Sequence, residues 1–186
     1  MVAKATPICD FGRKAVAFRL NDADGRAFSL DDIRGGKGTL VMFICNHCPY
    51  VRAVADRIAR DASELQQYDI GVIAIMPNDY SRYPEDSPAN MKAFAARHGF
   101  GFPYVVDTTQ QVARAYGAVC TPDFFGFNAD LQLQYRGRLD ESKTDAKPDA
   151  RRELFEAMVK VARTGQGPSE QIASMGCSIK WREDME

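Results

Sequence analysis

The sequence has little of what marks a membrane, secreted or nucleic-acid-binding protein. None of its apolar runs approaches the roughly 20 residues that are needed to span a bilayer, and residues 1–13 lack the apolar core of a secretion signal. Its 24 basic and 25 acidic residues are spread along the chain and leave a net charge of −1. We therefore expect a cytoplasmic protein with neither a nucleic-acid nor a membrane partner.

Two kinds of ligand motif are also missing. Cys45, His47 and Cys48 could supply three zinc ligands, with Cys120 as a fourth, but the two separated ligand pairs that are usual in structural zinc sites are absent. The glycine-rich residues 35–38 precede a predicted strand instead of joining a strand to a helix, which argues against a phosphate-binding loop. We expect no metal and no organic cofactor.

What is present is typical of an ordinary globular protein. With 186 residues, 45% of them apolar and 26% charged, the chain is long enough to bury a substantial core. We find no internal repeat and no linker. The sequence therefore predicts a single domain over residues 1–186, with its core at about 15–164 and a C-terminal tail at 165–186.

Cysteines are the most informative residues. The chain has an odd number of them: Cys9, Cys45, Cys48, Cys120 and Cys177. In a reducing compartment, the cysteines of a chain this long are more often catalytic, metal-binding or simply buried than paired in structural disulfides.

Residues 40–68 organise the rest of the chain. Residues 40–44 are apolar and predict a strand buried on both faces, and helical spacing of apolar residues begins at Pro49. Pro49 suits the first helical position, which places Cys48 at the N-cap, where free N–H groups stabilise an anion. Because a thiolate is such an anion, Cys48 is the candidate nucleophile.

The remaining pattern alternates strands and helices. A hairpin (15–20 and 27–30) precedes the central strand, and a second buried strand (70–76) makes a parallel βαβ unit with it. There follow a helix at 88–98 with Ser87 as its N-cap, a strand at 103–106, a short helix capped by 107–109, an antiparallel pair (124–127 and 131–136) and a helix at 150–163. The sequence therefore predicts an α/β fold with a mixed central sheet flanked by helices.

This order resembles the thioredoxin fold in its peroxiredoxin-like elaboration, related to the AhpC/TSA proteins. The resemblance rests on the strand into Phe43, the cysteine cluster with its helix, and the segment Tyr-Gly-Ala-Val-Cys-Thr-Pro that ends at Pro122. The run Cys-Asn-His-Cys-Pro-Tyr-Val and the closing run Gly-Cys-Ser-Ile-Lys-Trp at 176–181 are similar to those of a particular subgroup of that family. The resemblance implies a cis peptide bond before Pro122, in a loop that holds a thiol partner against the nucleophile.

The resemblance also bears on which cysteine attacks. In thioredoxins the first active cysteine follows the phenylalanine near the strand end by five residues, and five residues after Phe43 is Cys48. Val51 then takes the place of the second cysteine, which is also the place of the peroxide-reducing cysteine in peroxiredoxins. If a small deletion instead moves Cys48 to that place, Cys48 could react with peroxide, with Cys45 where peroxiredoxins carry a hydroxyl residue.

A dithiol cycle also needs a resolving thiol. Cys45 is our first candidate because it lies three residues upstream, Cys120 is the second because it lies beside Pro122, and Cys177 is the third because the tail would have to fold back. The alternative for Cys120 and Cys177 is a small buried hydrophobic residue.

Four further residues are expected to contact the substrate or the nucleophile: His47, Pro49, Thr121 and Pro122. A protonated His47 would lower the thiol pKa of Cys48, although His47 could also be a solvent-facing loop residue. The tail, with Lys180 and Trp181, is expected to cover the domain or its active face.

The sequence thus predicts a thiol-disulfide oxidoreductase with Cys48 as nucleophile and Cys45 or Cys120 as resolving thiol. A thiol-dependent peroxidase of antioxidant function and a non-catalytic redox sensor or binding module are the alternatives. The expected partners are a substrate with a disulfide or a peroxide and an external thiol reductant. The oligomeric state and the identity of the electron donor stay open.

Overall fold

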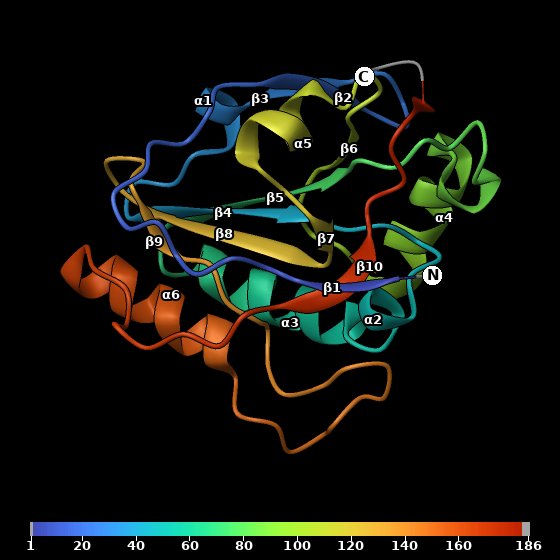
Figure 1. Cartoon of the computed structure of the whole chain (residues 1–186). Helices are drawn as coiled ribbons and strands as arrows, with labels where there is room; N and C mark the ends of the chain where they lie inside the picture. Colours follow the sequence, from blue (N-terminus) through green and yellow to red (C-terminus); the bar gives the residue numbers. More distant parts are fainter. Residues whose placement is uncertain (1, 184–186) are drawn as a thin grey trace.

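The main sheet runs through the centre of the molecule and joins strands from most of the chain (Figure 1). The computed structural model describes residues 2–183. The strand order is β3-β2-β6-β5-β4-β8-β9. These strands are β2 (Arg19–Asp22), β3 (Ala27–Ser29), β4 (Gly38–Phe43), β5 (Ile70–Met76), β6 (Tyr104–Val106), β8 (Asp123–Asn128) and β9 (Leu133–Tyr135). Strand β4 pairs in parallel with β5 and antiparallel with β8, which confirms the predicted mixed sheet.

Helices cover both faces of this sheet (Figure 1). They are α1 (Leu30–Ile33), α2 (Pro49–Arg52), α3 (Ala55–Gln66), α4 (Pro88–His98), α5 (Gln111–Tyr116) and α6 (Glu153–Thr164), with a 3-10 turn η1 (Pro84–Asp86) before α4. Alternate residues of β4 point to opposite cores: Leu40 and Met42 pack on the side of α3 and α6, and Val41 and Phe43 pack on the side of α5. Because both faces are covered, β4 is buried along its whole length, as its unbroken apolar run predicts.

A second, small sheet joins the two ends of the chain to the middle. Its order is β1 (Ala3–Ala5), β10 (Met175–Ser178) and β7 (Cys120–Thr121), and both pairings are antiparallel. The sequence analysis predicted neither β1 nor β10, because three or four residues are too few to establish a period of two. The tail does cover the domain, as expected, and it does so as the central strand of this sheet.

The predicted helix after Pro49 is interrupted, and this part of the prediction was wrong. The short α2 ends at Arg52, and α3 begins after Val54, whose backbone leaves the helical region with φ −121° and ψ 3°. The predicted Ser87 cap is confirmed, because the Ser87 hydroxyl accepts a hydrogen bond from the N–H of Asn90. Helix α4 is capped at its end by Gly99, which is left-handed.

The described part of the chain, residues 2–183, has no helix long and apolar enough to cross a bilayer. The domain limits of 1–186 stay a prediction, and their ends at residue 1 and residues 184–186 lie outside the described residues.

Candidate active site

Cys48 lies where the sequence places it, at the N-cap of α2 with Pro49 in the first turn. Its side chain is completely buried, and its Sγ lies 3.1 Å from the carbonyl oxygen of Thr121. The peptide bond between Thr121 and Pro122 is cis, as the resemblance implied. The strand end of β4 and the short strand β7 thus bring the candidate nucleophile and the cis-proline loop together.

The thiol of Cys177 lies against that of Cys48. The two Sγ atoms are 2.8 Å apart although 129 residues separate them in the sequence. Strand β10 carries Cys177 into this position because it pairs antiparallel with β7, with Cys177 opposite Thr121. The tail does fold back, so the reason for ranking Cys177 last among the candidate resolving thiols does not hold.

Cys45 follows the end of β4 by two residues. It is fully buried, and its Sγ is 3.3 Å from the hydroxyl oxygen of Thr121. Burial raises the pKa of Cys45 well above its ordinary value, and its hydrogen bond with Cys48 and the charge of Asp86 raise it further. Cys45 is therefore a thiol at neutral pH and can donate its proton toward Cys48.

The pKa of Cys48 is lowered to about 5 by these neighbours. The largest contribution is the hydrogen bond with Cys45, which burial opposes, and further contributions come from Cys177 and the N–H of Val51. Val51 lies in the first turn of α2, so an N–H of the helix N-terminus contributes to the lowered pKa, after the hydrogen bond with Cys45. At neutral pH Cys48 is a thiolate between two protonated thiols.

The pKa of Cys177 shifts in the opposite direction from that of Cys48. Burial and the adjacent Cys48 raise its pKa to about 12, so Cys177 is protonated while Cys48 is charged. Its proton can move once Cys48 has reacted and no longer carries the negative charge.

Comparisons with known proteins show the family to which the chain belongs. The family model described as AhpC/TSA matches residues 11–136, which include Cys48 and Thr121 but not Cys177. The chain belongs to the AhpC/TSA family. An uncharacterized conserved protein from Geobacillus kaustophilus, known from its crystal structure, is 40% identical with a TM-score of 0.92, over 98% of either chain.

Two relatives carry informative names. The thiol-disulfide oxidoreductase ResA of Halalkalibacterium halodurans is 29% identical over 106 residues, which is 57% of this chain and 56% of ResA. This AhpC/TSA-family chain thus matches little more than half the length of that relative. The thioredoxin domain of a thiol-disulfide oxidoreductase from Bacteroides vulgatus has a TM-score of 0.57 at 17% identity, over 72% of this chain and 89% of that chain. That likeness confirms the thioredoxin fold.

In this AhpC/TSA-family site, His47 is held by a carboxylate that the sequence analysis missed. His47 Nδ1 lies 2.6 Å from Oδ2 of the fully buried Asp86, and this hydrogen bond raises the pKa of His47. The imidazole stacks on Tyr83 and its side chain is 12% exposed, so the solvent-facing alternative is wrong. A lone aspartate 39 residues away gives no local signal in the sequence.

Asp86 also holds the backbone that leads into Cys48. Its Oδ1 accepts from the N–H groups of Asn46 and His47, and its Oδ2 accepts from Asn78 Nδ2. Cys45, His47 and Asp86 place potential metal ligands within 4.8 Å of one another. Of these three, His47 and Asp86 are hydrogen-bonded to each other, and Cys45 Sγ contacts the hydroxyl of Thr121 instead.

Cys120 is not brought to the nucleophile in the same way. It lies opposite Ser178 in the pairing of β7 with β10, and its Sγ is 3.6 Å from the carbonyl oxygen of Pro122. Burial raises its pKa far above the ordinary value. These contacts favour the alternative of a small buried hydrophobic residue.

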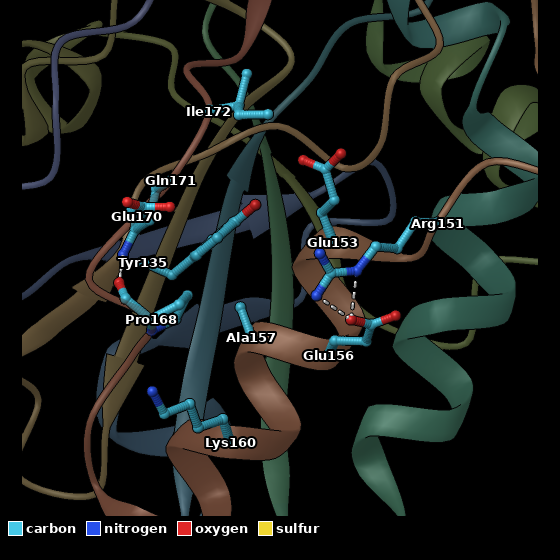
Figure 2. A pocket seen from close by; sticks show the side chains of 10 residues that line it. All are labelled: Tyr135, Arg151, Glu153, Glu156, Ala157, Lys160, Pro168, Glu170, Gln171 and Ile172. Atoms are coloured by element: carbon cyan, nitrogen blue, oxygen red, sulfur yellow. Dashed lines mark hydrogen bonds and ion pairs between the residues drawn. The ribbon is translucent and has the colours of Figure 1, made fainter.

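Two hollows lie on the side of α6 and the tail. The larger, of about 410 Å³, is lined by residues of α6 and of 168–172 and contains no cysteine (Figure 2). The smaller, of about 230 Å³, borders Tyr50, Pro122 and Met175. Only the smaller hollow adjoins the candidate active site, because each of these three residues is within two positions of Cys48, Thr121 or Cys177.

Proposed function

We propose that this protein is a thiol-disulfide oxidoreductase in which Cys48 attacks and Cys177 resolves. The observation that carries the proposal is the 2.8 Å distance between their sulfur atoms, together with the lowered pKa of Cys48. A low pKa gives the attacking thiolate, and a neighbouring thiol is what the release of a mixed disulfide requires.

The cycle has two exchange steps. The Cys48 thiolate attacks one sulfur of a substrate disulfide, forms a mixed disulfide with it and releases the other half as a thiolate. The Cys177 thiol then loses its proton to the medium and attacks Cys48 Sγ, which forms the internal disulfide and releases the second half of the substrate. An external dithiol returns both cysteines to thiols and is itself oxidised.

The other residues of the site support these steps. Cys45 donates a hydrogen bond to the Cys48 thiolate, and His47, held by Asp86, fixes the loop that precedes it. Thr121 contacts Cys48 through its carbonyl oxygen and Cys45 through its hydroxyl. Cys45 is thus proposed as a positioning residue, not as the resolving thiol.

A direct test is turnover of bis(2-hydroxyethyl) disulfide with dithiothreitol as the reductant. We expect catalysis above the uncatalysed exchange for the protein, none for Cys48→Ser, and normal catalysis for Cys9→Ser as the matched control. Turnover by Cys48→Ser equal to that of the unmodified protein would refute the role of Cys48.

A peroxidase is the second candidate, and the burial of Cys48 favours it. Hydrogen peroxide is small enough to reach a covered thiolate; it would oxidise Cys48 to a sulfenic acid and release hydroxide, and Cys177 would then form the same disulfide and release water. Stopped-flow measurement of Cys48 oxidation distinguishes the two candidates, because a peroxidase reacts much faster with peroxide than with the disulfide.

The cytoplasmic location belongs to the same proposal. In a reducing compartment Cys48 and Cys177 would be found mainly as thiols, ready to attack. Alkylation of intact cells followed by mass spectrometry measures this fraction; a permanently oxidised pair would point to an oxidising compartment instead.

A further inference from the structure

Two buried amide side chains, Asn78 and Gln110, hold the tail just after β10. Asn78 is 4% exposed and Gln110 has no exposed surface. Asn78 Oδ1 accepts a 2.9 Å hydrogen bond from the N–H of Lys180, and Gln110 Nε2 donates a 2.8 Å hydrogen bond to the carbonyl oxygen of Lys180. Gln110 Oε1 also accepts from the N–H of Arg182 at 2.9 Å. These two side chains, here called the amide pair, thus bind the main chain of residues 180–182.

The amide pair and the nucleophile lie at the same edge of the main sheet. Asn78 follows the end of β5 by two residues, Gln110 follows β6, and Cys48 follows β4. Because β5 pairs in parallel with both β4 and β6, the carboxyl ends of these three strands meet at one edge. The fold therefore brings the attacking cysteine and the residues that hold the tail to the same place.

Asn78 also joins the tail to the loop before Cys48. Its Nδ2 donates a 2.8 Å hydrogen bond to Oδ2 of Asp86, and the same oxygen lies 2.6 Å from His47 Nδ1. His47 directly precedes Cys48 in the sequence. Because Asn78 Oδ1 holds the tail, this one amide connects the tail to the segment that carries the nucleophile.

Gln110 holds the tail from the other side, and its backbone is unusual. Its φ is 62°, in the left-handed region that residues with a side chain rarely adopt. The amide makes three hydrogen bonds, to Pro77, Lys180 and Arg182, which offset this unfavourable conformation. The fold thus keeps Gln110 in a strained conformation that aims its amide at the tail.

The register of the tail decides where Cys177 points. Successive side chains of a strand point to opposite faces, so a shift by one residue would turn Cys177 away from Cys48. Strand β10 pairs with β1 and β7 over only two or three residues each. Ile179 and Trp181 pack in the core on the side of α5, but apolar contact has no direction and does not fix a register. Hydrogen bonds from the amide pair to the main chain do fix it.

We propose that Asn78 and Gln110 are positioning residues for the resolving step, because they keep the tail in the register that places Cys177 against Cys48. The proposal rests on the proposed function and adds two residues to the same reaction. In that step the Cys177 thiol loses its proton to the medium and attacks Cys48 Sγ, and the bound half of the substrate leaves as a thiolate. The amide pair acts on this step through the main chain of the tail.

The test separates attack from resolution. The reduced protein receives one equivalent of bis(2-hydroxyethyl) disulfide, and samples are quenched with acid and weighed as intact protein by mass spectrometry. Attack by Cys48 adds a mercaptoethanol unit to the protein, and resolution by Cys177 removes it. The two rates are therefore measured in the same experiment.

The variants are Asn78→Ala and Gln110→Met. Their matched controls are Asn90→Ala and Gln66→Met, which remove amides that donate to main-chain carbonyl oxygens at exposed positions. We expect the mixed disulfide to last at least about tenfold longer in Asn78→Ala and Gln110→Met, because Cys177 is no longer held at Cys48. The attack rate should stay unchanged in both variants, and both rates should stay unchanged in the controls.

Thermal melting identifies the variants that fold. Asn78→Ser is measured with them as the mildest change, since it keeps a polar group, and its mixed disulfide should last about threefold longer. Unchanged lifetimes in every folded variant, or equal slowing of attack and resolution, would overturn the positioning role. If the unmodified protein forms neither the adduct nor the disulfide between Cys48 and Cys177, the proposed function fails and the positioning role fails with it, so the two failures give different results.

Discussion

Cys48 and Cys177 are 129 residues apart in the sequence, and their sulfur atoms lie 2.8 Å apart. The pairing of β10 with β7 creates this relationship, with Thr121 opposite Cys177. A thiolate beside a thiol can form and break a disulfide. This arrangement needs a low pKa for Cys48 and a high pKa for Cys177, and both conditions are met.

Replacing Cys177 with serine should stop the cycle after its first step. The mixed disulfide on Cys48 then accumulates, and turnover of a small disulfide falls at least about a hundredfold, because an external thiol must replace one that is already positioned. Mass spectrometry of the intact protein after a single addition of disulfide measures the adduct. Cys120→Ser is the control; a stable adduct on Cys120→Ser but not on Cys177→Ser would reverse the assignment of the resolving thiol.

The reactivity of Cys48 should follow a pKa of about 5. Since only the thiolate reacts, the rate of alkylation by iodoacetamide is expected to rise as the pH passes through this value and to level off well below the ordinary pKa of a thiol. The measurement is the rate of modification of Cys48 by peptide mass spectrometry. A rate that still rises tenfold per pH unit between pH 7 and 8 would contradict the thiolate.

Cys45 supplies the largest part of that shift. Cys45→Ala should therefore move the midpoint of the Cys48 alkylation profile upward, because the thiolate loses a hydrogen-bond donor. Cys45→Ser keeps a donor at the same place and should restore most of the low midpoint. Both variants should still form the disulfide between Cys48 and Cys177. If Cys45→Ser and Cys45→Ala have the same midpoint, the hydrogen bond does not explain the pKa.

Asp86 should stabilise the protein in a pH-dependent way. Because the folded state raises the pKa of His47, this contribution is fully present below the unfolded pKa of about 6.5 and is lost as the pH rises through the folded value. Asp86→Asn should lower the free energy of unfolding, measured with urea at pH 5.5, by about 1–3 kcal/mol, because it disrupts a buried network. The loss should be smaller at pH 8.5.

Asp56→Asn is the matched control for this variant. Asp56 also lies 2.6 Å from a histidine, His98, but its side chain is 84% exposed. Asp56→Asn should lower the free energy of unfolding by at most about 0.5 kcal/mol. If Asp56→Asn and Asp86→Asn lower the free energy of unfolding equally, burial of the Asp86 network adds nothing to stability.

The centre of the fold could be predicted from the sequence, because its signals are local. The continuous apolar run of β4, the proline after Cys48 and the Ser87 cap each depend on neighbouring residues. The cis bond before Pro122 followed from the resemblance and is confirmed.

The parts that the sequence could not predict are held by contacts between distant residues. Strand β10 is four residues long and is held by its pairing with β1 and β7, where Gly176 packs against Thr121; no sequence period reveals these contacts. Asp86 likewise reaches His47 only after the chain has folded. For the same reason Cys177 ranked last by sequence separation, although its Sγ lies 2.8 Å from that of Cys48.

The measurement that tests the central claim most directly is a disulfide map of the protein after reaction with one equivalent of a small disulfide. Peptide mass spectrometry should find Cys48 joined to Cys177, and dithiothreitol should reverse the bond. A bond between Cys48 and Cys45 or Cys120, or a Cys48 that stays a free thiol, would contradict the account.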